Sequence, residues 1–167
     1  MKRKFIYPAS YLPHKNHRLL LSRKVVNFLN DYDIEILMTI DQKESNIFSD
    51  NCHRCIGEIS RSNLLNLIKD IDAVVFLSSF ESLGIPLIEA ANLNKSIICP
   101  ELDYAKELLG NSPYYFDLNN FDNTFIDIIK CFIMEHKKKN NRKSFLIKES
   151  LSYEKVWEIF LEELKIT

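Results

Sequence analysis

Two glutamates, Glu81 and Glu89, are the side chains whose placement best suits binding chemistry. Seven residues separate them, and a Gly84-Ile85-Pro86 turn lies in between. A carboxylate accepts hydrogen bonds from hydroxyl groups, and bonds to an ionised acceptor belong to the stronger class. We therefore expect Glu81 to contact sugar hydroxyls and Glu89 to hold a ribose diol. Spacing alone is insufficient, because Glu154 and Glu162 are equally far apart without a glycine or proline between them.

The turn between the two glutamates favours a site for an anion. Gly84 allows the backbone to bend sharply and approach a ligand, and Pro86 suits the first position of a helix. The amides and positive dipole end of that helix would then favour a diphosphate. A structural interpretation stays open, because an acidic residue in a first helical turn also complements the helix dipole and Glu81 could be a solvated loop residue.

The segment 7–17, Tyr-Pro-Ala-Ser-Tyr-Leu-Pro-His-Lys-Asn-His, offers a second candidate anion site. We expect a helix to begin just beyond Lys15. A lysine at that position is unfavourable for the helix dipole, and phosphate binding would explain its presence. The alternative is a Lys15 side chain that points into solvent. His14 and His17 could either bind phosphate or cap the helix.

Strand-like and helical stretches alternate along the chain, which predicts a parallel sheet with helices on both faces. We expect a single Rossmann-like α/β domain of about six strands. The predicted strands are 5–7, 34–40, 55–58, 73–77, 96–99 and 114–116. The predicted helices are 17–30, 63–71, 86–93, 104–109 and 121–136.

The strand at 73–77 should lie at the centre of the sheet. Its sequence, Ala-Val-Val-Phe-Leu, is apolar without alternation, as in strands buried on both faces. The loop 78–83 would leave the carboxyl end of this strand, where open α/β sheets bind their ligands. Both candidate anion sites therefore fall at the same edge of the predicted sheet.

Length and charge limit the classes of protein. The 167 residues, 46% of them hydrophobic, suffice for one domain with its own core. We assign 1–150 to the Rossmann-like domain and 151–167 to a C-terminal helix, after a basic solvated connection at 135–143. The 22 basic and 23 acidic residues give a net charge of −1, so we expect no nucleic-acid partner.

The four cysteines favour neither disulfides nor a metal site. The sequence lacks the features of a secretory signal and any apolar run of membrane-spanning length, so reduced thiols and a cytoplasmic location are expected. Cys52 and Cys55 flank His53, but a structural zinc site would need a second ligand pair. We expect no bound metal.

The stretch 80–91 resembles the Glu-x7-Glu signature of the retaining GT-B glycosyltransferases of the "glycosyl transferases group 1" family. The segment 7–17 is similar to the first strand and phosphate-binding lysine loop of their donor domain, in the form seen in bacterial polysaccharide-assembly enzymes. Further resemblances cover the short strand at 56–59, the strand at 96–99, the acidic helix around Glu107 and the final helix from Ser152.

The resemblance implies a role for each matching residue. Glu81 and Lys15 would be the catalytic residues, with Glu81 on the donor sugar and Lys15 neutralising the diphosphate. The backbone near Gly57 would meet the base, and Glu89 the ribose. The remaining donor-binding residues would be Ser10, Arg18, Gly84, Ile85, Pro86 and Leu87. The substrate would be a nucleotide-diphosphate sugar, with no cofactor and no metal.

The sequence departs from the family pattern at two places. The family often has Gly-Arg ahead of the lysine, whereas this chain has Ala9-Ser10, so diphosphate neutralisation would be weaker or Arg18 would substitute. The family also favours glycine in the turn before the fifth strand. Here the residue is Asn94, which tolerates the left-handed conformation better than most residues.

The resemblance covers only the donor half of a two-domain enzyme. Transfer would then require an N-terminal acceptor domain in cis or in trans, and that half could bring peripheral membrane association. The chain could be a fragment, a split subunit or a truncated gene product. A non-catalytic interaction subunit and one half of a GT-B epimerase remain alternatives. A nicotinamide dehydrogenase is disfavoured because Gly57, Gly84 and Gly110 form no Gly-x-Gly-x-x-Gly turn.

Overall fold

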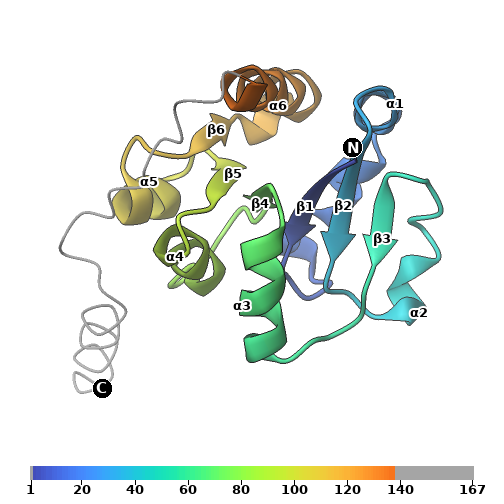
Figure 1. Cartoon of the computed structure of the whole chain (residues 1–167), viewed down its shortest axis with the longest axis horizontal. Coiled ribbons are helices and arrows are strands. Elements are labelled where there is room, and N and C mark those ends of the chain that lie inside the picture. The colour runs from blue at the N-terminus through green and yellow to red at the C-terminus, as the bar shows by residue number, and fades with distance from the viewer. Residues whose placement is uncertain (1, 138–167) are drawn as a thin grey trace.

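A computed structural model describes residues 2–137, and within them the chain forms a parallel α/β sandwich (Figure 1). The strand order is β3-β2-β1-β4-β5-β6, and every pairing is parallel. The strands are β1 (Arg3–Tyr7), β2 (Ile34–Met38), β3 (His53–Cys55), β4 (Ala73–Val75), β5 (Ser96–Pro100) and β6 (Tyr114–Phe116). The predicted fold class is confirmed.

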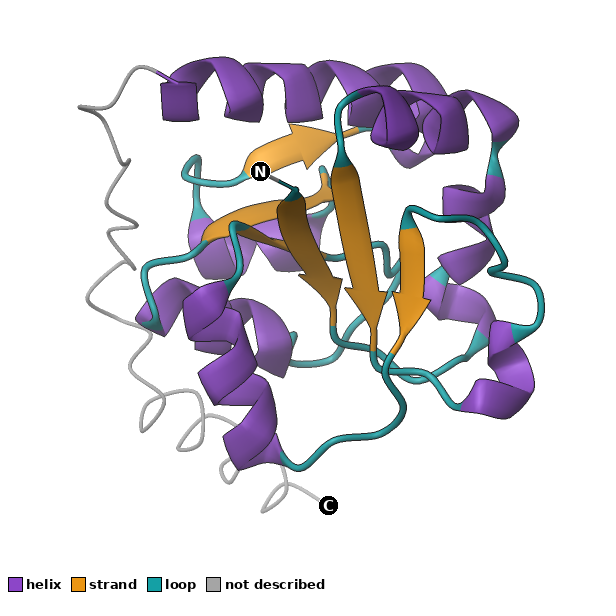
Figure 2. Ribbon diagram, turned by 45° about the vertical axis from the view of Figure 1, so that its right-hand side comes forward, coloured by secondary structure: helices purple, strands orange, loops and turns teal. Residues whose placement is uncertain are grey.

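Six α-helices accompany the strands in this part of the chain, and they lie on both faces of the sheet (Figures 1 and 2). Helices α1 and α6 contact each other on one face, and α4 and α5 contact each other on the other. The helices are α1 (Arg23–Asp31), α2 (Gln42–Ser45), α3 (Arg61–Asp70), α4 (Ile85–Asn92), α5 (Asp103–Leu109) and α6 (Phe121–Lys137). Residues 135–137 of the predicted connection belong to α6, and the rest of the connection, the final helix and the domain boundary near residue 150 lie outside the described residues.

The central strands β1 and β4 carry the core. Phe5, Ile6, Val74 and Val75 have no exposed surface, and Phe76 continues the buried run beyond β4. An apolar side chain of this size gains about 1.5–3 kcal/mol on full burial, so the strand pair anchors the fold. The prediction that 73–77 is central is confirmed, and the loop that follows it leaves the carboxyl edge of the sheet.

The predicted helix at 17–30 is only partly right. Residues Pro13–Lys15 and His17–Leu21 form two short 3-10 turns, and the α-helix begins at Arg23. Asn16 separates the two turns with a φ of 53°, a left-handed conformation that no α-helix can continue through. Lys15 therefore ends a 3-10 turn, and the argument from an unfavourable helix dipole does not apply to it.

The third strand and the helix before it also differ from expectation. Strand β3 occupies His53–Cys55, where Cys55 pairs with Met38 of β2, and Gly57 with a φ of 76° lies beyond its end. The predicted strand at 55–58 was therefore placed too late in the chain. Helix α2 was not predicted, because its four residues show no helical periodicity.

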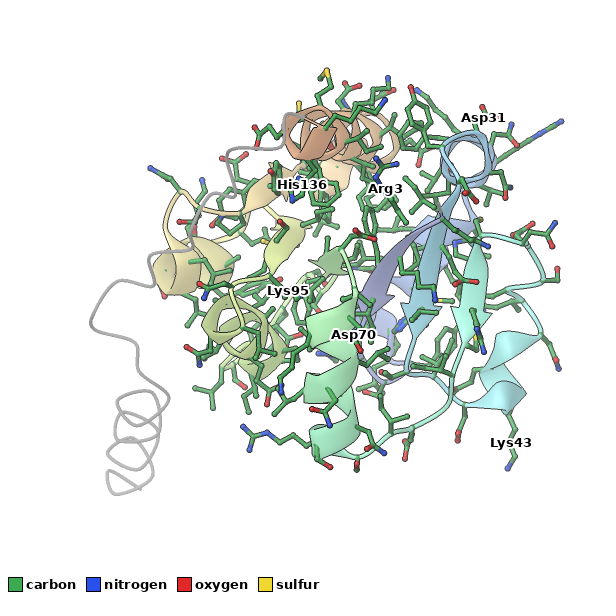
Figure 3. All side chains as sticks on the ribbon, viewed as in Figure 1. Arg3, Asp31, Lys43, Asp70, Lys95 and His136 are labelled. Atoms are coloured by element: carbon green, nitrogen blue, oxygen red, sulfur yellow. The ribbon has the colours of Figure 1, made fainter. Side chains whose placement is uncertain are left out.

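The turn between α4 and β5 lies at the sheet edge opposite the candidate site. Asn94 has a φ of 53°, which confirms the left-handed turn predicted there. The ammonium of Lys95 donates hydrogen bonds to the carbonyls of Lys69 and Ile71, 2.5 and 2.9 Å away. Figure 3 shows Lys95 and Asp70 close to this junction. These bonds satisfy carbonyls left unpaired at the carboxyl end of α3.

The described residues contain neither a membrane-spanning helix nor a metal cluster. No helix in 2–137 is long and apolar enough to cross a bilayer. Within the same residues, no group of three or more histidine, cysteine or acidic side chains could hold a metal ion. His53 is buried and lies 3.8 Å from Asp50, and Cys52 is buried beside it.

Candidate functional site

Lys15 and Glu81 form an ion pair at the carboxyl edge of the sheet. Lys15 comes from the loop after β1 and Glu81 from the loop after β4, and their side chains are 14% and 13% exposed. The Lys15 ammonium also lies 5.7 Å from the centroid of the Phe76 ring. The alternative interpretations, a lysine pointing into solvent and a solvated Glu81, are therefore wrong.

Direct hydrogen bonds tie the two loops together behind this pair. The side-chain amide of Asn16 donates to the carbonyl of Leu77 at 2.9 Å, and the backbone amide of Ser79 donates to the carbonyl of His14 at 2.9 Å. These bonds flank Lys15 on one loop and precede Glu81 on the other. The relative position of the ammonium and the carboxylate is therefore set by the backbone.

Tyr7, which is buried, and Tyr104, which is partly buried, hold the same loops through their hydroxyl groups. The Tyr7 hydroxyl donates to the carbonyl of Lys15 at 2.5 Å, and the Tyr104 hydroxyl donates to the carbonyl of Ser78 at 2.7 Å. Burial raises the pKa of both tyrosines above the usual value, so both hydroxyls keep the protons that these bonds require.

Glu89 lies in α4 with 6% of its surface exposed, and Arg61 pairs with it. The Nε of Arg61 donates to the Oε1 of Glu89 at 2.6 Å, while the Arg61 side chain remains 58% exposed. Arg61 is the first residue of α3, so this pair joins two helices that approach the carboxyl edge. An ion pair of this kind offsets the cost of burying a carboxylate.

The start of α4 has fewer free amides than a typical helix start. Gly84 precedes the helix with a φ of 56°, and its carbonyl accepts the Leu87 amide at 2.9 Å. Pro86 has no amide hydrogen. The amides of Gly84 and Ile85 make no backbone hydrogen bond within the described part of the chain. The amides of Leu87 and Ile88 already bond to the Gly84 carbonyl, so at this helix start the amides of Gly84 and Ile85 are the ones without a backbone partner among the described residues.

A cavity of about 250 Å³ lies beside the end of β1. The backbone at Gly57 borders this region and bonds through its amide to the carbonyl of Ile40 at 3.1 Å. The cavity brings Ser10 next to the segment in which a base was predicted to bind. Its wall is formed by Pro8, Ala9, Ser10, Thr39, Glu58, Ile59 and Leu64.

Arg18 does not line the cavity that contains Ser10. It lies in the wall of a separate cavity of about 500 Å³, where its Nε donates to the Tyr11 hydroxyl at 3.2 Å. His17 lies in the same wall, 2% exposed, and neither of its ring nitrogens has a hydrogen-bond partner among residues 2–137. The wall consists of Tyr11, Leu12, Pro13, Asn16, His17, Arg18 and Leu19.

Sequence reasoning missed Arg61, Asn16, Tyr7 and Tyr104. Arg61 follows Ser60, whose hydroxyl accepts the Asn63 amide as a helix cap, so the helix start itself was recognisable. Its contact with Glu89 spans 28 residues and leaves no local signal. The same holds for the hydrogen bonds of the two tyrosines, which depend on the sheet order.

Comparison with solved structures identifies the class of fold. The chain superposes on Anabaena HepE in complex with UDP and glucose with a TM-score of 0.75 and 14% identity, covering 99% of this chain and 49% of that one. It superposes on the pneumococcal O-GlcNAc transferase GtfA in complex with UDP and GlcNAc with a TM-score of 0.67 and 12% identity. This match covers 98% of this chain and 36% of the GtfA chain. The match to the GtfA/B complex has a TM-score of 0.72 at 14% identity and covers 99% of this chain and 36% of the matched chain.

These likenesses confirm that the chain has the fold of one Rossmann-like half of a GT-B glycosyltransferase. At identities this low, the comparison establishes the fold alone. The chain spans between 36% and 49% of the lengths of these proteins. No protein-family model matches the chain, and no curated protein sequence is similar to it.

Proposed function

We propose that this chain is the donor-binding half of a glycosyltransferase and that it binds a nucleotide-diphosphate sugar. The Lys15–Glu81 pair carries the proposal, because it places a cation and a carboxylate together at the ligand-binding edge of the sheet. HepE and GtfA, which share the fold, are each seen in complex with UDP and a sugar.

Each polar group has a role that follows from its position. Lys15 neutralises the diphosphate, and the Gly84 and Ile85 amides donate to it or to the sugar. Glu89, oriented by Arg61, accepts hydrogen bonds from the ribose. The cavity beside Ser10 receives the base. During transfer, negative charge grows on the leaving diphosphate, and prepositioned donors stabilise that charge without reorganising.

Glu81 has two roles that oppose each other. It holds Lys15 in place before the donor arrives, and it then accepts hydrogen bonds from the sugar hydroxyls. A bare nucleoside diphosphate brings negative charge near this carboxylate without offering it a hydroxyl, which is unfavourable. A nucleotide sugar supplies the missing donors, so Glu81 favours the sugar-bearing nucleotide over its product.

Transfer requires an acceptor-binding part, supplied in cis or in trans. Three large apolar side chains support an interface at the carboxyl edge: Leu12, Phe80 and Ile85 are 48%, 70% and 38% exposed. Phe80 is next to Glu81, so an acceptor domain covering it would close over the donor sugar. We propose a hexosyl transfer in the assembly of a bacterial surface polysaccharide.

Calorimetric titration of the 167-residue chain with UDP, GDP and ADP sugars tests the proposal. We expect one nucleotide class to bind and Glu89→Gln to weaken that binding at least tenfold, since the neutral amide binds a ribose diol less strongly. Asp127→Asn, an exposed acidic residue of α6, is the control and should leave binding unchanged. Binding of no member of the panel would refute the proposal.

A non-catalytic donor-binding subunit is the second candidate. The GtfA/B structure, a complex that shares this fold, is the observation that favours it. The two candidates differ in what is attached to the chain. Co-purification from the native source would yield either one polypeptide that contains the acceptor domain or a separate acceptor-binding protein.

A further inference from the structure

The larger cavity, lined by seven residues between Tyr11 and Leu19, has no role in the donor site described above. Its volume of about 500 Å³ falls within the roughly 300–1,000 Å³ of small-molecule pockets. It shares no wall residue with the cavity beside Ser10. Pro13 and Asn16, both in its wall, flank Lys15 in sequence, so a ligand here would lie beside the donor diphosphate.

His17 contributes a buried aromatic ring to the wall of this cavity. The imidazole packs between Tyr7 and Tyr11, with ring centroids 4.5 and 5.4 Å away, and both of its nitrogens lack partners among the described residues. Burial lowers the pKa of His17 to about 4, so at neutral pH the ring offers one N–H donor and one acceptor. The ring nitrogens have almost no exposed surface, so a ligand in the cavity would change the surroundings of this ring without a hydrogen bond to it.

Arg18 makes an anionic ligand more favourable than a cationic one in this cavity. The bond from its Nε to the Tyr11 hydroxyl leaves the other guanidinium hydrogens able to bind a ligand, and the side chain is exposed at the rim. No acidic residue contributes to the wall. An anionic group is therefore favoured over a cation, and a planar guanidinium binds carboxylates and phosphates through paired hydrogen bonds.

The rest of the wall fits a ring with an apolar face. Tyr11, Leu12, Pro13 and Leu19 supply apolar surface, and Asn16 and Arg18 supply polar groups. We propose that this cavity binds a sugar ring bearing a carboxylate or phosphate, as a subsite for the acceptor. The sugar ring packs on Tyr11 and its anionic group pairs with Arg18, beside the buried His17 ring. The acceptor role rests on the proposed donor function.

NMR of the imidazole resonances tests this assignment, because the chain has only four histidines. The probes are D-glucuronate and D-glucose 6-phosphate, with neutral D-glucose and inorganic phosphate as controls. We expect at least one acidic sugar to shift the His17 resonances saturably. Arg18→Gln should weaken that binding at least tenfold, while Arg23→Gln, an exposed arginine that starts α1, should not.

Three results would overturn the proposal. The first is that neither acidic sugar shifts the His17 resonances, the second that D-glucose binds as tightly as both acidic sugars, and the third that inorganic phosphate does so. Calorimetry with the nucleotide sugar separates this failure from failure of the donor proposal. Absence of acidic-sugar binding with intact nucleotide binding refutes the subsite alone. Acidic-sugar binding without nucleotide binding refutes the donor site, and with it the acceptor role of this cavity. Loss of nucleotide binding in Arg18→Gln would instead place Arg18 on the diphosphate and refute its role here.

Discussion

The side-chain amide of Asn16 donates a hydrogen bond of 2.9 Å to the backbone carbonyl of Leu77. This bond joins the loop that carries Lys15 to the end of the strand that leads to Glu81. Sixty-one residues separate the two partners along the chain. The bond therefore converts two distant loops into one rigid edge, and it requires both the left-handed backbone and the amide of Asn16.

Replacing Asn16 with glycine should separate these two requirements. Asn16→Gly keeps the left-handed backbone without strain but removes the donor, leaving the Leu77 carbonyl without its hydrogen bond. Asn94→Gly is the matched control, because Asn94 has the same φ of 53° and no side-chain hydrogen bond to another described residue. Denaturant unfolding should show Asn16→Gly to be less stable than Asn94→Gly by about 1 kcal/mol. Equal stabilities would show that the amide contributes nothing.

The Lys15–Glu81 pair should show strong coupling in a double-mutant cycle. Each side chain is nearly buried, so Lys15→Met or Glu81→Gln alone leaves a poorly solvated charge and should destabilise the fold by about 3 kcal/mol. The double variant removes both charges and should be more stable than either single variant. The exposed Lys130–Asp127 pair on α6 serves as the control, with an expected coupling below about 1 kcal/mol. Additive effects at Lys15 and Glu81 would contradict a coupled pair.

Gly84→Ala should disturb the start of α4 in two ways. The left-handed backbone costs a residue with a side chain about 1–3 kcal/mol. The new methyl group would also lie 2.9 Å from the Cδ1 of Leu108, so that side chain must move. In a Leu108→Val background the second contribution should fall and the first should remain, as measured by thermal unfolding. A Gly84→Ala protein as stable as the wild type would contradict the observed backbone conformation.

Stability should fall as the pH is lowered from about 6.5 to about 4. Burial lowers the pKa of His17 and of His53 from 6.5 to about 4 in the folded protein. Between these values the unfolded chain binds protons that the folded chain does not, so acid favours unfolding. Each histidine accounts for at most about 3 kcal/mol across this range.

The contribution of His17 to this pH dependence of stability can be measured separately. His17→Phe keeps an aromatic ring between Tyr7 and Tyr11 but cannot be protonated. Between pH 5 and pH 6, roughly midway through the range, its unfolding free energy should depend on pH less steeply than that of the wild type, by about 1.4 kcal/mol per pH unit. Identical slopes would mean that His17 is protonated in the folded protein.

Local sequence features predicted the sheet well and the loops less well. The unbroken apolar run 73–77 indicates burial on both faces, and β4 is central as expected. The α-helix predicted at 17–30 begins only at Arg23, because residues 17–21 form a 3-10 turn and Ser22 has a non-helical backbone, a break that a single serine does not reveal in the sequence. Arg61 was missed because its bond to Glu89 exists only once β3, α3 and α4 are assembled.

We propose that Lys15 and Glu81 bind adjacent parts of a nucleotide-diphosphate sugar, Lys15 the diphosphate and Glu81 the sugar. The most direct test measures the affinities of three variants for one nucleotide sugar and for the corresponding free nucleoside diphosphate. Lys15→Met should weaken both ligands at least tenfold, while the α6 control Lys130→Met should weaken neither. Glu81→Gln should bind the free diphosphate as well as the wild type or better and lose the preference for the sugar-bearing form. Unchanged affinities in Lys15→Met, or an undiminished sugar preference in Glu81→Gln, would contradict the account.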